Sequence, residues 1–260
     1  MKKFVALLLA VLMVASLCAC GQKGTGSDLQ TVTKGKLIMS TNAEFAPYEY
    51  VADDGKGFQG TGYEGIDIEI AYALAQKLGL ELVVDNMDFD AALSAVQTGK
   101  SDMVAAGVTV TPDRLNAMSF TDSYANGVQV VIVKEGSDIK SIDDLEGKKI
   151  GTQRGTTGFL YCSDDFGDDN VIGFDDGATA VQNLKAGKVD CVVIDNAPAQ
   201  EYVKANPGLT ILDTEYANED YAIGIAKDNT ALQEALNKAL AELKADGTIQ
   251  SIIDKYIPAK

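Results

Sequence analysis

Histidine and tryptophan are absent from this 260-residue chain, and only four cysteines are present. Without histidine there is no Ser-His-Asp triad, no Cys-His pair and no histidine-ligated metal site. Apart from Cys18 and Cys20 near the N-terminus, the cysteines are Cys162 and Cys191. Two cysteines do not build a zinc or iron–sulfur site by themselves, although outside the cell they could form a disulfide or stay free. The sequence therefore predicts no metal and no cofactor.

Basic residues are also scarce. The chain has 22 Lys and Arg against 38 Asp and Glu, which gives a formal charge of −16. Removing Lys2 and Lys3 with a signal peptide would leave 20 basic residues and a charge of −18. Because such an acidic protein repels phosphates and anionic lipid surfaces, we expect no nucleic-acid partner.

Long apolar runs are lacking except at the N-terminus. Residues 4–19 follow a basic start and are fewer than the ~20 that span a bilayer, which is typical of a secretion signal. The run ends in LCACG (17–21), which resembles the cleavage box of bacterial lipoproteins. Cys20 fits the lipidated position because the small Ala19 precedes it. A diacylglycerol there would supply two acyl chains, enough for stable anchoring.

These features predict a signal peptide at 1–19, with lipidated Cys20 as the first mature residue. Residues 20–34 are rich in Gly, Thr, Ser and Gln, which indicates a flexible tether. We therefore expect the folded part to lie outside the cytoplasm, anchored to the cell membrane.

The stretch Asp102 to Arg114 (DMVAAGVTVTPDR) is the most informative part of the chain. Its apolar first part predicts a buried strand, and TPD at 111–113 has the residue types of a helix start. Such a start favours an anion, and Arg114 adds a planar fork that matches a carboxylate. Gly107 and Thr109 lie close upstream. The stretch outlines a small-carboxylate site; the alternative is a capped helix with a solvated arginine.

Strand and helix patterns alternate along the rest of the chain, and this order predicts parallel sheets with ligands at their carboxyl edges. The helix expected at 65–78 carries Ile66, Ile70, Leu74 and Leu78 on one face. The remaining expected strands are 35–40, 80–84, 128–133, 148–152, 171–174, 189–194 and 221–227, and the remaining helices are 90–98, 178–186, 231–244 and 248–256.

The second half has two further candidate features at strand ends. The Gly- and Thr-rich turn at 153–158 could hold an anion through backbone N–H groups, or be a plain helix cap. Asp195, at the tip of an apolar strand, is either a cap for the next helix or a ligand for a cation. Residues 96–104 and 184–192 resemble one another, which predicts two similar lobes facing each other across a cleft.

Several motifs occur in a characteristic order: a lipoprotein signal, FAPYEY, GYEGIDIEIAYALAQKLG, LSAVQTGKSDMVAAGVTVTPDR, FTDSY, KKIGTQRGTTG and GKVDCVVID. Together they resemble the polar-amino-acid solute-binding proteins of ABC importers, the family-3 group with the type II periplasmic-binding fold. The resemblance covers 35–260. It implies two α/β lobes, each a mainly parallel sheet flanked by helices. It places lobe 1 at 35–123 plus 222–260, lobe 2 at 129–216, and hinge strands at 124–128 and 217–221.

The resemblance also implies roles in holding the ligand backbone. The α-carboxylate would lie against the Arg114 guanidinium, the Thr109 hydroxyl and N–H, and the Thr157 N–H. The α-ammonium would lie against the Asp195 carboxylate, the Gly107 carbonyl and the Thr109 hydroxyl. Both charged groups of an amino acid would thus be held at once.

Phe45 and Ile66 are implied to sandwich the ligand, although many relatives carry a second aromatic at the position of Ile66. Asn42, Glu44 and Gln153 are implied to face the ligand side chain. The complete expected binding set is Asn42, Glu44, Phe45, Ile66, Ala106, Gly107, Thr109, Arg114, Gln153, Thr157 and Asp195.

The implied function is capture of a polar L-amino acid by a monomer that delivers it to a permease and its ATPase, without catalysis. Neutral Asn42 and Gln153 favour glutamine or cystine, whereas Glu44 could pair with arginine or lysine, so the ligand stays open. One alternative is a cyclohexadienyl-dehydratase-like enzyme, which would need Glu44, Glu49 or Asp195 as its acid. Another is an amino-acid sensor domain, which would need a transmembrane segment and an output domain.

Overall fold

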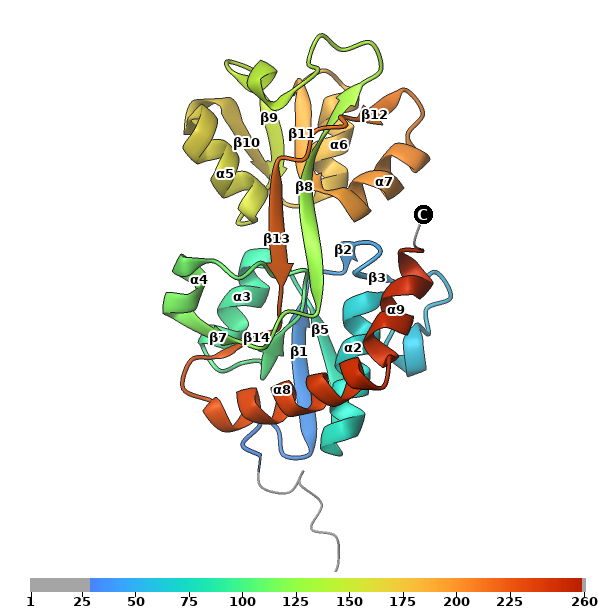
Figure 1. Cartoon of the computed structure of the whole chain (residues 1–260), viewed down its shortest axis with the longest axis vertical. Coiled ribbons are helices and arrows are strands. Elements are labelled where there is room, and N and C mark those ends of the chain that lie inside the picture. The colour runs from blue at the N-terminus through green and yellow to red at the C-terminus, as the bar shows by residue number, and fades with distance from the viewer. Residues whose placement is uncertain (1–28, 259–260) are drawn as a thin grey trace, which may run out of the picture.

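The computed structural model describes residues 29–258 and consists of two α/β lobes joined by two neighbouring strands (Figure 1). The predicted signal peptide, Cys20 and most of the expected tether lie outside the described residues. Within residues 29–258, no helix is long and apolar enough to cross a membrane. The same residues contain no cluster of three or more acidic or Cys side chains suited to a metal ion.

Lobe 1 is built on a five-stranded sheet with the order β5-β1-β6-β14-β7. Strand β1 is parallel to β5 and β6, whereas β14 is antiparallel to β6 and β7. A small antiparallel sheet of β2, β3 and β4 stands beside it. The strands are β1 (Lys36–Thr41), β2 (Glu44–Phe45), β3 (Glu49–Val51), β4 (Tyr63–Glu64), β5 (Glu81–Asn86), β6 (Met103–Val104), β7 (Met118–Phe120) and β14 (Gly224–Ala226).

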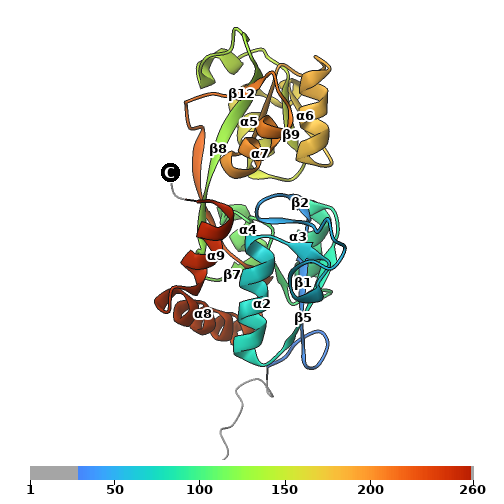
Figure 2. The same ribbon diagram turned by 90° about the vertical axis from the view of Figure 1, so that its right-hand side faces the viewer.

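The helices of lobe 1 cover this sheet, and the two C-terminal ones pack against α2 (Figure 2). They are η1 (Phe58–Gly60), α2 (Ile66–Leu78), α3 (Phe89–Gln97), α4 (Pro112–Ala117), α8 (Thr230–Ala245) and α9 (Thr248–Tyr256). Helix α2 ends where Gly79 adopts the left-handed conformation, at φ 68°, and its N–H caps the Ala75 and Gln76 carbonyls.

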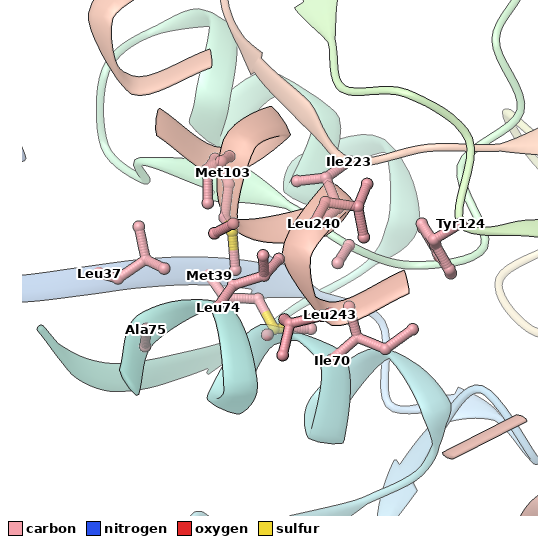
Figure 3. Close-up of a cluster of buried hydrophobic side chains, with 14 of the residues drawn as sticks. Leu37, Met39, Ile70, Leu74, Ala75, Met103, Tyr124, Ile223, Leu240 and Leu243 are labelled. Atoms are coloured by element: carbon pink, nitrogen blue, oxygen red, sulfur yellow. The ribbon is translucent and has the colours of Figure 1, made fainter. Parts of the chain in front are cut away.

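The core of lobe 1 forms where the apolar stripe of α2 meets β1 and α8 (Figure 3). Leu37 and Met39 of β1, Leu74 of α2 and Leu240 of α8 are at most 1% exposed. Burial of one such side chain stabilises the fold by about 1.5–3 kcal/mol. This core fixes α2, whose first turn lies close to the cleft between the lobes.

Lobe 2 is built on a sheet with the order β10-β9-β11-β8-β12, with β13 also paired to β8. Its strands are β8 (Ala125–Lys134), β9 (Ile150–Gln153), β10 (Val171–Phe174), β11 (Cys191–Asp195), β12 (Leu209–Ile211) and β13 (Ala217–Tyr221). Its helices are η2 (Ile142–Leu145), α5 (Thr157–Phe166), η3 (Asp168–Asn170), α6 (Gly177–Lys185) and α7 (Asn196–Ala205).

Strands β8 and β13 connect the two lobes. They pair antiparallel from Ala217 opposite Gln129 to Tyr221 opposite Ala125, and both views show them running between the lobes. The pairing lets each of the two connecting strands support the other. The ends of both strands that lie in lobe 1 are next to the cleft.

Both sheets contain more antiparallel pairing than the expected mainly parallel sheets. Only β10, β9 and β11 are mutually parallel in lobe 2, because β8 enters from lobe 1 in the opposite direction and β12 and β13 pair with it. In lobe 1 the chain returns as β14, again antiparallel. The α/β two-lobed class is confirmed, with mixed sheets.

Two further expectations can be compared with the structure. The strand expected from residue 102 onward is only two residues long, since Gly107 turns the backbone at φ 54°. Cys162 and Cys191 are free thiols buried in one apolar cluster of lobe 2, and not a disulfide. Burial raises the pKa of the Cys162 thiol to about 12, so this group stays protonated and unreactive at neutral pH.

Candidate functional site

A cavity between the lobes is lined by residues from both of them. Most of the residues in the expected binding set line it: Asn42, Phe45, Ala106, Gly107, Thr109, Arg114, Gln153, Thr157 and Asp195. The carboxyl ends of β9 and β11 and the turns after β1 and β6 meet there, as expected for strands of open α/β sheets.

Thr111 and Pro112, from which α4 was predicted, fix the start of this helix and thereby position Arg114. The Thr111 hydroxyl accepts a hydrogen bond from the Arg114 N–H at 3.2 Å, and Pro112 is the first helical residue. The guanidinium donates through Nη1 to the Thr109 carbonyl at 2.9 Å and through Nη2 to the Gly155 carbonyl of lobe 2 at 3.1 Å. The Arg114 Cζ also lies 5.4 Å from the centre of the Phe89 ring.

The electrostatic position of Arg114 favours an anion in the cavity. The residue is 9% exposed, and its desolvation lowers the pKa of the guanidinium. Glu219 and Asp90 oppose this shift electrostatically, but no salt bridge to Arg114 is formed by a carboxylate of residues 29–258. Since arginine stays charged in proteins, the site contains a largely desolvated cation, and within residues 29–258 its guanidinium bonds only to two backbone carbonyls.

Asp195 both caps a helix and lines the cavity, so the two alternatives for this residue are compatible. Its Oδ1 accepts from the Ala197 N–H at 2.9 Å and its Oδ2 from the Val128 N–H at 2.8 Å. Burial raises the pKa of the Asp195 carboxyl to about 6, although these two backbone bonds and Tyr221 lower it. At neutral pH the group is therefore an anion facing the same cavity as Arg114.

Gly107 lines the same cavity, and its backbone conformation strongly favours glycine. Its φ is 54°, and a Cβ would lie 2.9 Å from a ring carbon of Phe45. Its N–H donates to Asp67 Oδ2 at 2.9 Å, which fixes the peptide plane at the cavity wall. Across the cleft, the hydroxyl oxygens of Thr109 and Thr157 are 3.5 Å apart.

The other end of the cavity carries uncharged amides. Gln153 of lobe 2 donates through Nε2 to Asn42 Oδ1 of lobe 1 at 2.9 Å. Asn42 in turn donates to the Met87 carbonyl at 3.0 Å. The Gln153–Asn42 bond and the Arg114–Gly155 bond both join the lobes, so the structure is closed over the cavity.

Two members of the expected set do not line the cavity. Glu44 is exposed outside it, and burial together with the nearby Asp176 and Asp88 raises the pKa of its carboxyl. Ile66 is completely buried in the lobe 1 core, against which Phe45 also packs, and it is not among the residues that line the cavity. Besides Phe45, two aromatic residues line the cavity, Tyr221 and Phe89, and Phe89 lies against Arg114.

Several lining residues were missed in the sequence: Glu49, Phe89, Gln129, Thr156, Val193, Ile194 and Tyr221. Tyr221 ends the crossover segment expected at 217–221, and Phe89 directly precedes the helix expected at 90–98. Glu49 is the only acid within FAPYEY, an apolar loop segment, which is a usable signal. The arrangement as a whole offers a buried cation, a buried anion and amides, which complements a small zwitterion.

Comparison with known proteins agrees with this geometry. Residues 37–259 match the bacterial extracellular solute-binding proteins, family 3. The chain is 33% identical over 266 residues to the arginine-binding extracellular protein ArtP of Bacillus subtilis, covering 98% of each. The arginine-, lysine-, histidine-binding protein ArtJ of Geobacillus stearothermophilus has a similar structure, with 32% identity and TM-score 0.80, over 86% of this chain and 96% of that one.

An ancestral arginine-binding protein bound to glutamine is 40% identical with TM-score 0.80, over 87% of this chain and all of that one. The fold, the cavity between its lobes and these similarities lead to one assignment. This chain belongs to the bacterial extracellular solute-binding proteins of family 3.

Proposed function

We propose that this protein captures a free polar L-amino acid between its lobes and presents it to the permease and ATPase of an ABC importer. One observation carries the proposal: Arg114 of lobe 1 and Asp195 of lobe 2 line the same buried cavity. An amino acid carries its anion and its cation on one carbon, so it can satisfy both residues only when the lobes are closed.

In this proposal the α-carboxylate lies against Arg114, Thr109 and the Thr157 N–H, and the α-ammonium against Asp195 and the Gly107 carbonyl. Binding shifts an open–closed equilibrium toward the closed form, and closure is what a permease recognises. The lobes would rotate about 124–128 and 217–221, as 35–123 plus 222–260 against 129–216. The names of ArtP and ArtJ, and the glutamine in the ancestral relative, support an amino-acid ligand.

Among polar amino acids, we propose that a cationic side chain is preferred. Glu44 of lobe 1 lies near Asp176 of lobe 2 and Asp88; burial raises the pKa of Glu44, and repulsion by these two carboxylates raises it further. A cationic group reaching past Asn42 and Gln153 toward these acids would reduce that repulsion. The same end of the cavity also accommodates a neutral amide, which keeps glutamine as the second candidate.

The test is a binding screen of the twenty L-amino acids by thermal shift and calorimetry, with citrulline, prephenate and arogenate added. We expect arginine or lysine to raise the melting temperature most and glutamine less. Prephenate and arogenate should neither bind tightly nor be converted. Of the three candidate acids, Glu44 lies outside the cavity, Asp195 is held by two backbone N–H groups, and Glu49 is completely buried at the cavity wall. Turnover of either compound, or binding of no amino acid, would contradict the proposal.

The membrane attachment is a separate proposal, and it rests on the LCACG segment alone. Cys20 would carry the lipid, 20–34 would be the tether, and the protein would act as a monomer at the cell membrane. Cys20→Ala should release the protein from the membrane fraction, and globomycin should block its processing. A Cys18→Ala variant is the matched control and should remain attached.

A further inference from the structure

Glu49 and Asp67 form a pair of buried carboxyl groups beside the cavity. Glu49 is on β3 and lines the cavity, and Asp67 is in the first turn of α2. Both residues are completely buried. Within residues 29–258, both carboxyl oxygens of Glu49 and the Oδ1 of Asp67 have no hydrogen-bond donor. The binding mechanism proposed above uses neither residue.

The remaining oxygen of Asp67 holds two parts of the binding apparatus. Asp67 Oδ2 accepts from the Gly107 N–H at 2.9 Å and from the Tyr124 hydroxyl at 2.8 Å. Gly107 borders the cavity, and Tyr124 directly precedes β8, the first connection to lobe 2. Asp67 thereby joins the wall of the cavity to the start of a crossover strand.

Two adjacent carboxylates cannot both stay ionised in such a site, because neither the burial nor their repulsion is compensated. The groups that face the pair are the hydroxyls of Tyr48 and Tyr124, with Asp195 beyond Tyr48. No Lys or Arg of residues 29–258 forms a salt bridge with either carboxyl. A proton is the missing partner: as an acid, Glu49 can donate to Asp67.

This arrangement agrees with the electrostatics of both groups. Burial, together with Asp67, raises the pKa of Glu49 well above its usual range. Burial also raises the pKa of Asp67 to about 6, and the bonds from Gly107 and Tyr124 lower it. The proton therefore belongs on Glu49, and Asp67 remains the charged acceptor.

We propose that Glu49 and Asp67 share one proton, and that this protonated pair positions Gly107 and Tyr124 for ligand binding. The part that concerns ligand binding rests on the proposed function; the shared proton does not. Glu49 and Asp67 are positioning residues, acting through the groups that Asp67 holds.

The first experiment measures unfolding free energy against pH for the wild type and for Glu49→Gln, without ligand. An unfolded Glu loses its proton above a pKa of about 4.3, while the folded pair keeps its proton. The stability of the wild type relative to the variant should therefore fall as pH rises, until the pair itself titrates. Between pH 5 and 7, the ratio of the two unfolding constants should change roughly tenfold per pH unit.

Asp67→Asn provides a second variant, which removes the repulsion from Asp67 but leaves Glu49 buried. Because burial is the main cause of the raised pKa of Glu49, this residue should keep its proton, and the stability of Asp67→Asn should fall with pH relative to Glu49→Gln as that of the wild type does. If the curves of the wild type and Glu49→Gln run parallel, the folded protein holds no extra proton and the proposal is wrong.

The second experiment measures the affinities of Glu49→Ala and Glu49→Gln for L-arginine and L-glutamine at pH 6. Alanine removes the donor to Asp67 and should weaken binding roughly tenfold. Glutamine donates in place of the acid and should restore most of that loss. Equal losses in both variants would overturn the positioning role. If neither amino acid binds the wild type, the proposed function is wrong. The unfolding experiment needs no ligand, so it still tests whether Glu49 and Asp67 share a proton.

Discussion

The two ends of the cavity are built differently. At the end with Arg114 and Asp195, each charged group is buried and hydrogen-bonded to backbone atoms. At the end with Asn42 and Gln153, the groups are neutral amides that bond to one another and to the Met87 and Asp175 carbonyls, with Glu44 exposed beyond them. Both ends are hydrogen-bonded to the main chain, but the first carries two opposite buried charges and the second only uncharged amides.

The charged end suits the two groups that all amino acids share, and the amide end suits the side chains, in which they differ. Every α-amino acid presents a carboxylate and an ammonium, so rigid, buried charges can be specific for them. The ligand side chains differ, and an amide pair with an acid nearby can be altered without disturbing the fold. We therefore expect affinity to be determined mainly at the charged end and selectivity at the amide end.

The largest effect is expected from Arg114→Ala. Removing one partner of a buried charge pair costs on the order of 2–5 kcal/mol, which weakens binding roughly thirty- to several-thousand-fold. Arg114→Lys should recover only part, because a point charge does not reproduce the planar fork. Calorimetry with the preferred amino acid measures both variants.

A double-mutant cycle checks whether Arg114 meets the carboxylate. Amidation of the ligand carboxylate should harm the wild type about as much as Arg114→Ala does, and add almost nothing in the variant. Additive losses would place the carboxylate elsewhere and remove the basis of the comparison between the two ends.

A smaller loss, roughly ten- to hundredfold, is expected from Asp195→Asn, because it weakens one charged hydrogen bond. Asn is also a good helix cap, so α7 should keep its start. The des-amino analogue of the ligand should hardly respond to the change. If the amino acid and its analogue lose affinity equally, Asp195 only caps α7 and does not contact the ligand ammonium.

The pH dependence of binding provides a second measure of Asp195. Burial raises the pKa of its carboxyl to about 6, so the free protein takes up a proton there as pH falls below 6. A protonated acid no longer attracts an ammonium, and wild-type affinity should fall up to about tenfold per pH unit below 6. Titration calorimetry from pH 7 to 4.5 should show this fall in the wild type and a flatter profile in Asp195→Asn.

At the amide end, we expect arginine to bind more tightly than citrulline, which has the same shape without the charge. The difference should be roughly fivefold, because Glu44 is largely solvated and exposed ion pairs contribute about 1 kcal/mol or less. Glu44→Gln should reduce this difference and leave citrulline binding nearly unchanged. Equal affinity for both ligands in competition calorimetry would contradict a preference for cations.

The sequence alone was sufficient to predict the family, the two-lobed α/β class and the start of α4. Thr111, Pro112 and Arg114 predict their own conformation, because a helix cap depends on neighbouring residues. The antiparallel pairings of β8 and β14 could not be predicted this way, since they depend on where the chain crosses between lobes. The same holds for the contact of Glu49 with Asp67, which are separated in sequence and meet only through packing.

Two predictions made for Ile66 from the sequence conflict with each other. The helical stripe of Ile66, Ile70, Leu74 and Leu78 predicts a core position, whereas the resemblance to relatives implies a place against the ligand. In the structure Ile66 is completely buried in the lobe 1 core and does not line the cavity. Helical periodicity reports which face packs inward, and the burial of Ile66 agrees with it, whereas the place of Ile66 against the ligand stays a prediction.

The smallest expected effect on binding tests this placement. Ile66→Val removes one methylene from the core, so it should lower the free energy of unfolding by about 0.5–1.5 kcal/mol. Ligand affinity should change less than about twofold, because additivity holds for sites that share no partner. Phe89→Leu is the matched change at the cavity, and it should weaken binding more because Phe89 lines the cavity next to Arg114. Thermal unfolding and calorimetry on both variants separate the two roles. A loss of affinity in Ile66→Val without a loss of stability would return Ile66 to the ligand and make Phe89 a supporting residue.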